Sequence, residues 1–350
     1  MQGFCSGIFS SITPVMVKEY SPIEISGSLG TLQNILILVG VFSSFLFSFF
    51  FEAGGMKPAH YWFYGFAFPL LQILLQQLLF AFVYTSETPK YLLVKGRNEE
   101  AKELIGHIYN EQFQEAVYHE KLRDLEADSQ EIEGEEKEYP KDHPIAIFLG
   151  FSLQAFQQLS GVNVIQLYSG ELAEGFLPST ESFFPIIVNG QKLLFGIIGY
   201  FMMGVWGRRA ILTRGMLTVA LCEVGMFIGF MNSSEGNSWA PVLILGCLCV
   251  FLFSFNVSLG PLTWLYVSEI VQPGLIPFTT MTNWIFSTLI IGSFPIIRSH
   301  SENKDVPGLF IFYAACTFVI FGIFCALMVE TKDKTELQIR EDFNHIRMCS

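Results

Sequence analysis

Long apolar runs, uninterrupted by charge, dominate the chain. Residues 29–51, 240–268 and 309–329 contain no Asp, Glu, Lys or Arg, and they are apolar on every side of a helix instead of along one stripe. A run of about 18 or more such residues can cross the ~30 Å hydrocarbon core of a bilayer. The pattern predicts nine spans, the first of them short for a complete crossing: 3–17, 29–51, 62–85, 144–172, 183–206, 210–231, 240–268, 277–298 and 307–329.

One hydrophilic segment, 90–143, divides these spans into two blocks. Within it, 98–110 has apolar residues at helical spacing behind two glutamates in the first turn, and 111–127 repeats that amphipathic character. Residues 129–139 are rich in glutamate, which predicts disorder. We therefore expect two or three short helices on the membrane face; the alternative is a solvated linker.

Composition supports a multi-span membrane protein. Of 350 residues, 51% are hydrophobic and only 15% are charged, against about 25% charged in ordinary soluble domains; the mean hydropathy is +0.44. The net charge of -12 does not suggest a nucleic-acid-binding surface. Fifteen acidic and eight basic residues lie within 90–143, so that segment alone contributes -7.

The distribution of basic residues predicts the orientation. If the 90–143 segment faces the cytoplasm, alternating loops place sixteen of the twenty Lys and Arg residues on that side. Lys57, Arg298 and Lys304 fall outside, and Lys192 lies within a span. We therefore expect the 90–143 segment and the C-terminal tail to be cytoplasmic.

Motifs of catalysis and metal binding are missing from the sequence. It has no P-loop, G-x-S-x-G, H-E-x-x-H or dinucleotide-binding glycine motif. The seven cysteines form no C-x-x-C pair or zinc-spaced cluster, and most lie in apolar spans, where they are expected to pack as small hydrophobic residues. We expect no enzyme, no catalytic residue, no cofactor and no metal.

Seven short motifs occur at the ends of the spans or inside them. They are Pro14-Val-Met-Val-Lys-Glu19-Tyr-Ser-Pro22 with Gly27-Ser-Leu-Gly30, Glu87-Thr88-Pro89-Lys90-Tyr91-Leu92, Gln157-Gln158-Leu159-Ser160-Gly161-Val162-Asn163, Gly207-Arg208-Arg209, Gly260-Pro261-Leu262-Thr263-Trp264 with Glu269, Asn283-Trp284, and Glu330-Thr331-Lys332 with Lys334-Thr335. Each motif alone is modest. Together, in this order and spacing, they resemble the sugar porter family of the major facilitator superfamily over essentially the whole chain.

The resemblance implies an all-α integral membrane protein with the major facilitator fold. Met1 aligns within the family's fourth span, so about three N-terminal spans are expected to be missing and about nine transmembrane helices to be present. The expected divisions are a partial N-terminal half (1–89), a cytoplasmic helical linker (90–143), a C-terminal six-helix half (144–329) and a cytoplasmic tail (330–350).

The resemblance also implies a substrate site among polar residues at membrane depth. Three amides of one span, at 157, 158 and 163, share one broad helical face, and amides facing lipid are costly. Amides both donate and accept, which suits sugar hydroxyls. The implied substrate-binding residues are Gln157, Gln158, Asn163, Asn34, Lys192, Asn256, Trp264 and Asn283. The alternative is that these amides only join helices through hydrogen bonds.

Charged residues at the cytoplasmic ends of the spans are implied to gate the carrier. They are Glu19, Glu87, Lys90, Arg208, Arg209 and Glu269. The family's pattern is incomplete, because Ser26 and Ile276 stand where relatives have Arg, and Gly204 stands where they have an acid. These departures indicate altered coupling, another substrate or no transport at all.

Lys192 and Glu223 are isolated charges inside two consecutive predicted spans. They lie about fifteen and fourteen residues from the turn at Gly207, and therefore at the same depth on neighbouring antiparallel helices at 1.5 Å per residue. A lone charge in a bilayer is costly, so one hypothesis is a direct Lys192–Glu223 pair. The other is that Lys192 faces the central cavity and favours an anionic or carboxylated solute.

The leading functional prediction is transport of a hexose-like sugar by alternating access, with a small-molecule sugar and the lipid bilayer as partners and no nucleic acid. The plasma membrane is the expected location and an organelle membrane the alternative. A rival from another class is a transport-inactive relative, which would be a structural subunit or sensor in a membrane assembly. A third is an incomplete gene model of a twelve-span carrier. The sequence leaves the sugar, and uniport against proton symport, open.

Overall fold

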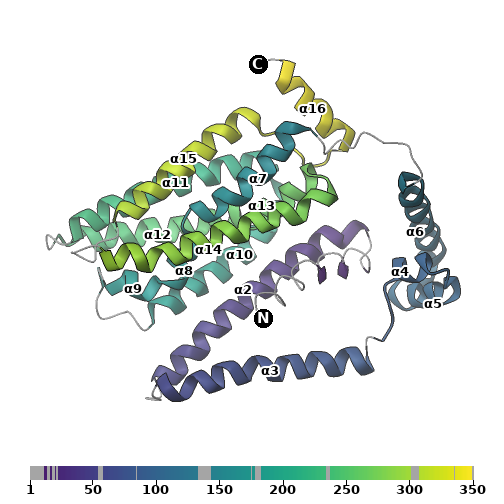
Figure 1. Cartoon of the computed structure of the whole chain (residues 1–350), viewed down its shortest axis with the longest axis horizontal. Helices are drawn as coiled ribbons and strands as arrows, with labels where there is room; N and C mark the ends of the chain where they lie inside the picture. Colours follow the sequence, from purple (N-terminus) through teal and green to yellow (C-terminus); the bar gives the residue numbers. More distant parts are fainter. Residues whose placement is uncertain are drawn as a thin grey trace. The chain divides into compact units, whose positions relative to one another are not determined.

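The computed structural model shows an all-helical protein (Figure 1). The structure describes residues 12–13, 16–17, 20, 23–53, 58–83, 85–132, 143–174, 176–177, 183–233, 237–300, 307–334 and 336–348. Within those ranges no strand occurs. The predicted fold class is therefore confirmed at the level of secondary structure.

The helices follow one another with short connections. In chain order they are α2 (Ile23–Ala53), α3 (Pro58–Phe82), α4 (Pro89–Val94), α5 (Asn98–Ile108), α6 (Glu111–Ile132), α7 (Pro144–Leu159), α8 (Val162–Leu167), α9 (Ser169–Glu174), α10 (Phe184–Val205), α11 (Arg208–Ser233), α12 (Trp239–Val257), α13 (Leu259–Ile270), the 3-10 turn η2 (Pro273–Leu275), α14 (Ile276–His300), α15 (Pro307–Leu327) and α16 (Glu336–Met348).

Eight of these segments are long and apolar enough to cross a membrane. They match eight of the nine predicted spans, and their large apolar side chains are often exposed, as lipid contact requires. The remaining prediction, 3–17, lies almost entirely outside the described residues.

The chain forms two compact units. The first comprises Met1–Gln33 and Gly55–Glu138, and the second comprises Asn34–Gly54 and Tyr139–Ser350. Helix α2 starts in the first unit and continues in the second. The residues of the predicted substrate site lie in the second unit.

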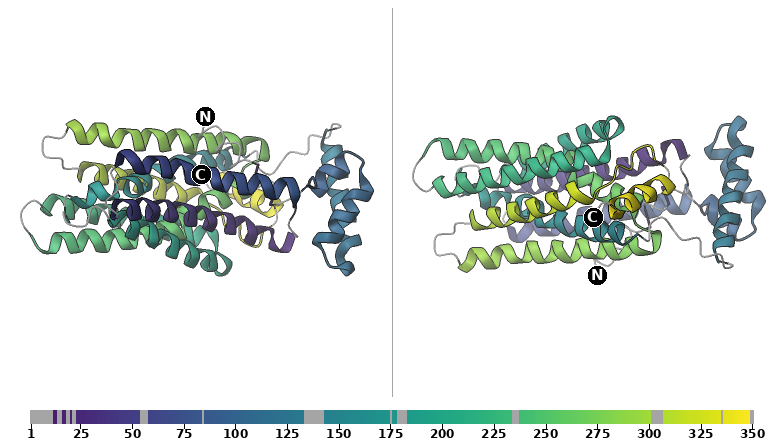
Figure 2. Two further views of the ribbon diagram at one scale, coloured as in Figure 1. Left: turned by 90° about the horizontal axis from the view of Figure 1, so that it is seen from below. Right: turned by 90° about the horizontal axis from the view of Figure 1, so that it is seen from above.

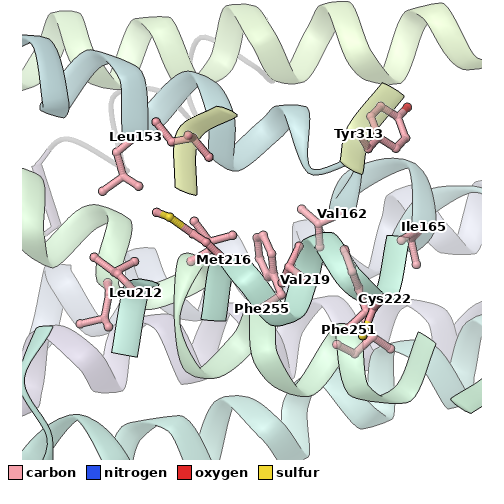
Figure 3. Close-up of a cluster of buried hydrophobic side chains, with 14 of the residues drawn as sticks. Leu153, Val162, Ile165, Leu212, Met216, Val219, Cys222, Phe251, Phe255 and Tyr313 are labelled. Atoms are coloured by element: carbon pink, nitrogen blue, oxygen red, sulfur yellow. The ribbon is translucent and has the colours of Figure 1, made fainter. Parts of the chain in front are cut away.

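In the second unit, α7 and α10 to α15 run side by side as a bundle of roughly aligned helices (Figures 1 and 2). Its core is apolar, and Leu153, Leu212, Met216 and Phe251 are fully buried. Figure 3 shows these side chains converging from α7, α11 and α12. Because lipid tails are as apolar as leucine, van der Waals packing must hold such a core together.

Helices α11 and α12 approach each other over small residues. A Cβ at Gly225 would overlap Sγ of Cys247, and one at Gly229 would overlap the side chain of Ile244. Gly225 and Gly229 are spaced as G-x-x-x-G, which lets membrane helices pack at close range. This contact fixes α11 against the rest of the bundle.

Two predicted spans are interrupted in the structure. The span predicted at 144–172 consists of α7, α8 and α9, and the one at 240–268 consists of α12 and α13. The first span breaks at Gly161, which has a left-handed φ of 70°, and again at Tyr168, which follows α8. The second span breaks at Ser258, with φ -115° and ψ -90°. Apolar patterning could not show the breaks at Gly161 and Ser258, because both sides of each are equally apolar.

The linker contains the expected short helices. Helix α5 lies within the predicted 98–110 segment, and α6 extends to Ile132. Leu92, Leu93 and Ala101 are buried in a small apolar cluster of their own. The prediction of disorder is wrong for 129–132, which continue α6, while 133–139 lie outside the described residues.

The tail contains a helix that the apolar pattern did not predict. In α16, Ile339 and Phe343 are buried, while Glu341 between them is exposed and Arg340 and Asp342 are half-buried. The ring of Phe343 stacks on His143 with centroids 5.6 Å apart, and Nδ1 of His143 accepts a hydrogen bond from the Ile145 amide at 3.3 Å. The tail thus covers the start of α7.

Candidate functional site

Four side-chain amides from α7, α8 and α14 form one continuous hydrogen-bonded cluster. Asn283 Nδ2 donates to Gln157 Oε1 at 2.7 Å, and Gln158 Nε2 donates to Asn283 Oδ1 at 2.8 Å. Asn163 Nδ2 donates to Gln158 Oε1 at 2.5 Å. The cluster thereby brings together four of the predicted substrate-binding residues.

Backbone carbonyls anchor this amide cluster to neighbouring helices. Gln157 Nε2 donates to the carbonyls of Leu259 at 2.9 Å and Gly260 at 3.1 Å, in the first turn of α13. Asn283 Nδ2 also donates to the Gln154 carbonyl at 3.0 Å. Gln157 and Asn283 are 5% and 2% exposed. Their donors are fully used, so they act as the rigid base of the cluster.

The other end of the cluster has spare hydrogen-bonding capacity. Asn163 Nδ2 donates to Ser287 Oγ at 3.1 Å, which leaves the Ser287 hydroxyl proton available. Asn163 is half-buried, and its Oδ1 accepts no hydrogen bond from a described residue. A spare carbonyl acceptor beside a spare hydroxyl donor can receive a hydroxyl group, which needs both.

The break at Gly161 explains why these amides point together. Its left-handed backbone places α8 at an angle to α7, and a Cβ there would overlap the Tyr313 ring of α15. Ser160 Oγ donates to the Gln157 carbonyl at 2.7 Å, which satisfies a backbone group at the end of α7. Glycine is the residue that combines this φ with so close an approach.

Lys192 lies on α10 and is 7% exposed. Its Nζ donates to Oε1 of Gln166 on α8. Gln166 follows Asn163 by three residues, so the two lie on one face of α8. The structure therefore brings Lys192 to the helical face that carries the amide cluster.

The hypothesis of a Lys192–Glu223 pair is wrong. No ion pair joins the two among the described residues, and neither carboxylate oxygen of Glu223 has a hydrogen-bond partner although the residue is 0% exposed. Thr317 lies nearby on α15, but its hydroxyl donates to the Tyr313 carbonyl at 2.9 Å. Equal depth on neighbouring helices did not bring the two charges onto facing sides.

Two other predicted site residues lie near the cluster without joining it. Asn256 is buried, and its Nδ2 donates to the Leu252 carbonyl of its own helix at 2.7 Å. Trp264 lies one turn after Gly260 on α13, where Gln157 binds, and is 41% exposed. Its indole presents an open apolar surface about one turn from the amides.

Asn34 lies elsewhere in the same unit. On the facing sides of α2 and α10, Leu38 packs at Gly196 and Phe42 packs at Gly190. The two helices therefore run antiparallel, and Asn34, one turn before Leu38, lies toward the C-terminal end of α10. Its side chain is half-buried.

The predicted gating residues of the second unit form a polar cluster at one end of the bundle. Arg208 Nη2 contacts Glu269 Oε1 at 3.4 Å, and Thr331 Oγ1 donates to Glu269 Oε2 at 2.6 Å. Arg209 Nη2 donates to the Cys325 carbonyl at 3.1 Å. We call this group, with Glu330, the end cluster.

Glu330 holds the end cluster together from its centre. Its Oε1 accepts the backbone N–H of Arg208 at 2.8 Å, and its Oε2 accepts that of Arg209 at 3.1 Å. Oε1 also accepts the amides of Thr331 at 3.1 Å and Lys332 at 3.0 Å. A carboxylate at the first turn of α11 satisfies amides that have no partner within the helix and interacts favourably with the helix dipole.

The remaining predicted gating residues belong to the first unit. Glu87 is exposed and Lys90 is half-buried in the first turn of α4, where Thr88 Oγ1 accepts the Tyr91 amide at 3.3 Å. Glu19 lies outside the described residues.

Several polar contacts were not predicted. Ser287 and Gln166 each lie one turn from a predicted residue, so extending those residues by helical spacing would have found them. At the other end of the bundle, Arg298 Nη2 contacts Glu174 Oε2 at 2.8 Å, and Nη1 contacts Glu171. In the described ranges, no group of three His, Cys, Asp or Glu side chains is placed to hold a metal ion.

Comparison with known proteins gives consistent matches along the chain. The family model described as "Sugar (and other) transporter" matches residues 1–343. The major myo-inositol transporter IolT of Bacillus subtilis is 26% identical over 97% of this chain and 72% of its own length. Facilitated glucose transporter member 2 of Gallus gallus is 26% identical over 99% of this chain and 64% of its own length. The chain thus spans about two thirds of these relatives.

A solved structure shares the fold. The inward-open xylose transporter XylE from E. coli superposes with a TM-score of 0.74 at 20% identity, covering 95% of this chain and 69% of that one. At this identity the likeness shows the fold alone, which is that of the major facilitator superfamily.

Proposed function

Because this chain belongs to the sugar (and other) transporter family, we propose that it binds a polyhydroxylated solute of hexose size and carries it across a membrane by alternating access. As a family member with eight apolar helices, it is a multi-pass integral membrane protein. We place it in the plasma membrane.

The observation that carries this proposal is the half-satisfied end of the amide cluster. Gln157 and Asn283 are bonded to backbone and to each other, so their positions are fixed before a solute arrives. Asn163 Oδ1 and the Ser287 hydroxyl are then presented by a rigid support, and preorganised groups bind with a smaller entropy cost. The open indole face of Trp264 supplies an apolar surface for the C–H groups of a sugar ring.

The two ends of the bundle suit a carrier that must open and close. The end cluster and the Arg298 contacts lie at opposite ends of the helices, as the alternating direction of α10 to α15 requires. We propose that the end cluster holds the cytoplasmic ends of α11, α13 and α15 as one body while the solute site opens to either side. Glu87 and Lys90, the predicted gating residues of the first unit, would take part in the opening and closing of the carrier.

The test is solute uptake and binding by the whole chain. Radiolabelled hexose and inositol uptake is measured in a transporter-null host, and binding is measured on purified protein. Asn163→Ala and Ser287→Ala are expected to weaken binding by about 1–3 kcal/mol, because a solute hydroxyl loses its partner. Thr288→Val is the matched control, since the exposed Thr288 hydroxyl bonds its own helix at Trp284.

Unchanged binding in both variants would reject the site, and absence of both binding and uptake would reject the function. Binding without uptake would favour the alternative, a transport-inactive subunit or sensor. The relatives named above are transporters by their names, which gives that alternative no support.

A further inference from the structure

The buried ammonium group of Lys192 has an incomplete set of partners. An ammonium group has three N–H donors, and one described acceptor, Gln166 Oε1, receives one of them. No acidic residue pairs with Lys192 among the described residues, and Glu223, the carboxyl group at the same depth, makes no bond to it. Two donors and the positive charge therefore have no counterpart among the described residues.

The acids nearest along the neighbouring elements have other partners. Glu171 and Glu174, on the α9 helix that packs against α10, both contact Arg298. The polar side chains described beside Lys192, Gln166 on α8 and Asn189 on α10, are neutral amides. A cation inside a membrane protein faces the bundle interior, is costly to insert, and marks a solute or ion pathway by default.

A second polar atom on the same face of α10 also has no partner in the part of the chain that the structure describes. Asn189 precedes Lys192 by three residues, so the two side chains lie one above the other. Asn189 is 2% exposed; its Nδ2 donates to the Pro185 carbonyl at 2.8 Å, while its buried Oδ1 accepts no hydrogen bond from a described residue. An unpaired buried acceptor one turn from a buried cation matches a ligand that carries both an anionic group and hydroxyls.

We infer that the solute of this carrier is a sugar acid whose single carboxylate binds Lys192 while its hydroxyls bind Asn163, Ser287 and Asn189. The inference rests on the proposed transport function and narrows its substrate class. The ammonium lies at the α8 face that carries Asn163, so one hexose-sized molecule reaches both groups. One cation balances one carboxylate, whereas a phosphate, with nearly two negative charges, calls for a second cation that α8 and α10 do not supply.

The experiment compares three probes on the purified whole chain in neutral detergent: D-glucuronate, D-glucose and D-glucose 6-phosphate. Wild type is expected to bind glucuronate at least tenfold more tightly than glucose, and also more tightly than the phosphate. Lys192→Gln is expected to remove that preference, and Lys192→Arg to keep it. Lys95→Gln, which removes an exposed linker lysine, is the charge-matched control. It should leave the ratio of the affinities for glucuronate and glucose unchanged.

Each result separates the inference from the function beneath it. Glucose binding equal to glucuronate binding in wild type would overturn the inference and leave sugar transport standing. A preference for the phosphate would overturn the carboxylate assignment, and a preference that survives in Lys192→Gln would overturn the role of the lysine. No binding of any probe would overturn the proposed function and the inference together. If Lys192→Gln does not fold, competition of glucuronate against bound glucose in wild type and in Lys192→Arg still shows whether the site prefers a carboxylate.

Discussion

Asn283 Nδ2 donates to Gln157 Oε1 over 2.7 Å and thereby joins α14 directly to α7. Both side chains are buried, so neither can exchange this bond for one to water. The same asparagine accepts from Gln158, which makes it the one residue described here that binds both adjacent glutamines through its side chain.

Asn283→Ala is expected to lower the free energy of unfolding by about 1–3 kcal/mol, because Gln157 Oε1 and a Gln158 N–H would remain buried without a partner. Thermal denaturation of the purified chain measures this. Thr282→Val is the control, since the exposed Thr282 hydroxyl bonds the Phe278 carbonyl of its own helix. Equal melting temperatures for the two variants would contradict a structural role for the bond.

Gly161→Ala is expected to destabilise the second unit. The φ of 70° costs a non-glycine residue about 1–2 kcal/mol, and the added methyl group overlaps the Tyr313 ring, which must move. Gly246→Ala provides the comparison, because no atom lies within 4 Å of a Cβ there and the position is helical. The prediction fails if both variants unfold at the same temperature.

Glu330→Gln is expected to loosen the end cluster while keeping its shape. The substitution removes the negative charge at the start of α11 and turns one acceptor oxygen into a donor, which cannot bind the Arg209 amide. A loss of about 0.5–2 kcal/mol is the usual size for a capping group. Glu341→Gln, on the exposed side of α16, is the control, and calorimetry of both is the measurement.

Glu223→Gln is expected to leave stability unchanged or to raise it. Among the described residues Glu223 has no cationic partner, and neither of its oxygens has a hydrogen-bond partner. Its replacement by a neutral side chain of equal size therefore breaks no ion pair and removes a buried ionisable group. Glu269→Gln, in contrast, should destabilise, because it breaks the contact with Arg208. A larger loss for the Glu223 variant would show that its carboxylate has a partner after all.

In the linker, the bidentate hydrogen bond from Arg97 lowers the pKa of Glu100. The ion pair therefore stabilises the start of α5 at pH values above the ordinary glutamate pKa of about 4.3, and this stabilisation is lost as the pH falls through the lower folded pKa. A carboxyl-carbon NMR titration measures the shift, and Arg97→Gln should raise the pKa again. Because both side chains are exposed, high salt should weaken the effect; a titration that Arg97→Gln leaves unchanged would contradict it.

Much of the fold follows from the sequence because lipid imposes a simple rule. Every backbone group inside the bilayer must be bonded internally, so an apolar run such as 309–329 has to be a helix. The amide cluster could be expected for a related reason, since Gln157 and Asn163 inside an apolar span need partners.

The rest depends on which sides of the helices face each other. Depth along the chain places Lys192 and Glu223 level, but rotation about the helix axis decides whether they meet, and packing of small residues such as Gly225 sets that rotation. Likewise, the order of charges gives no sign that Glu330 would bind the backbone amides of Arg208 and Arg209. That contact needs the close approach that Gly207 permits.

The stacking of Phe343 on His143 has a consequence for how the protein is made. The two residues are 200 positions apart in the chain, and ribosomes add about 5–20 residues per second. For roughly 10–40 s after His143 is synthesised, the start of α7 therefore has no ring to cover it. During that interval this end of the bundle stays uncovered, and it is closed once α16 has emerged.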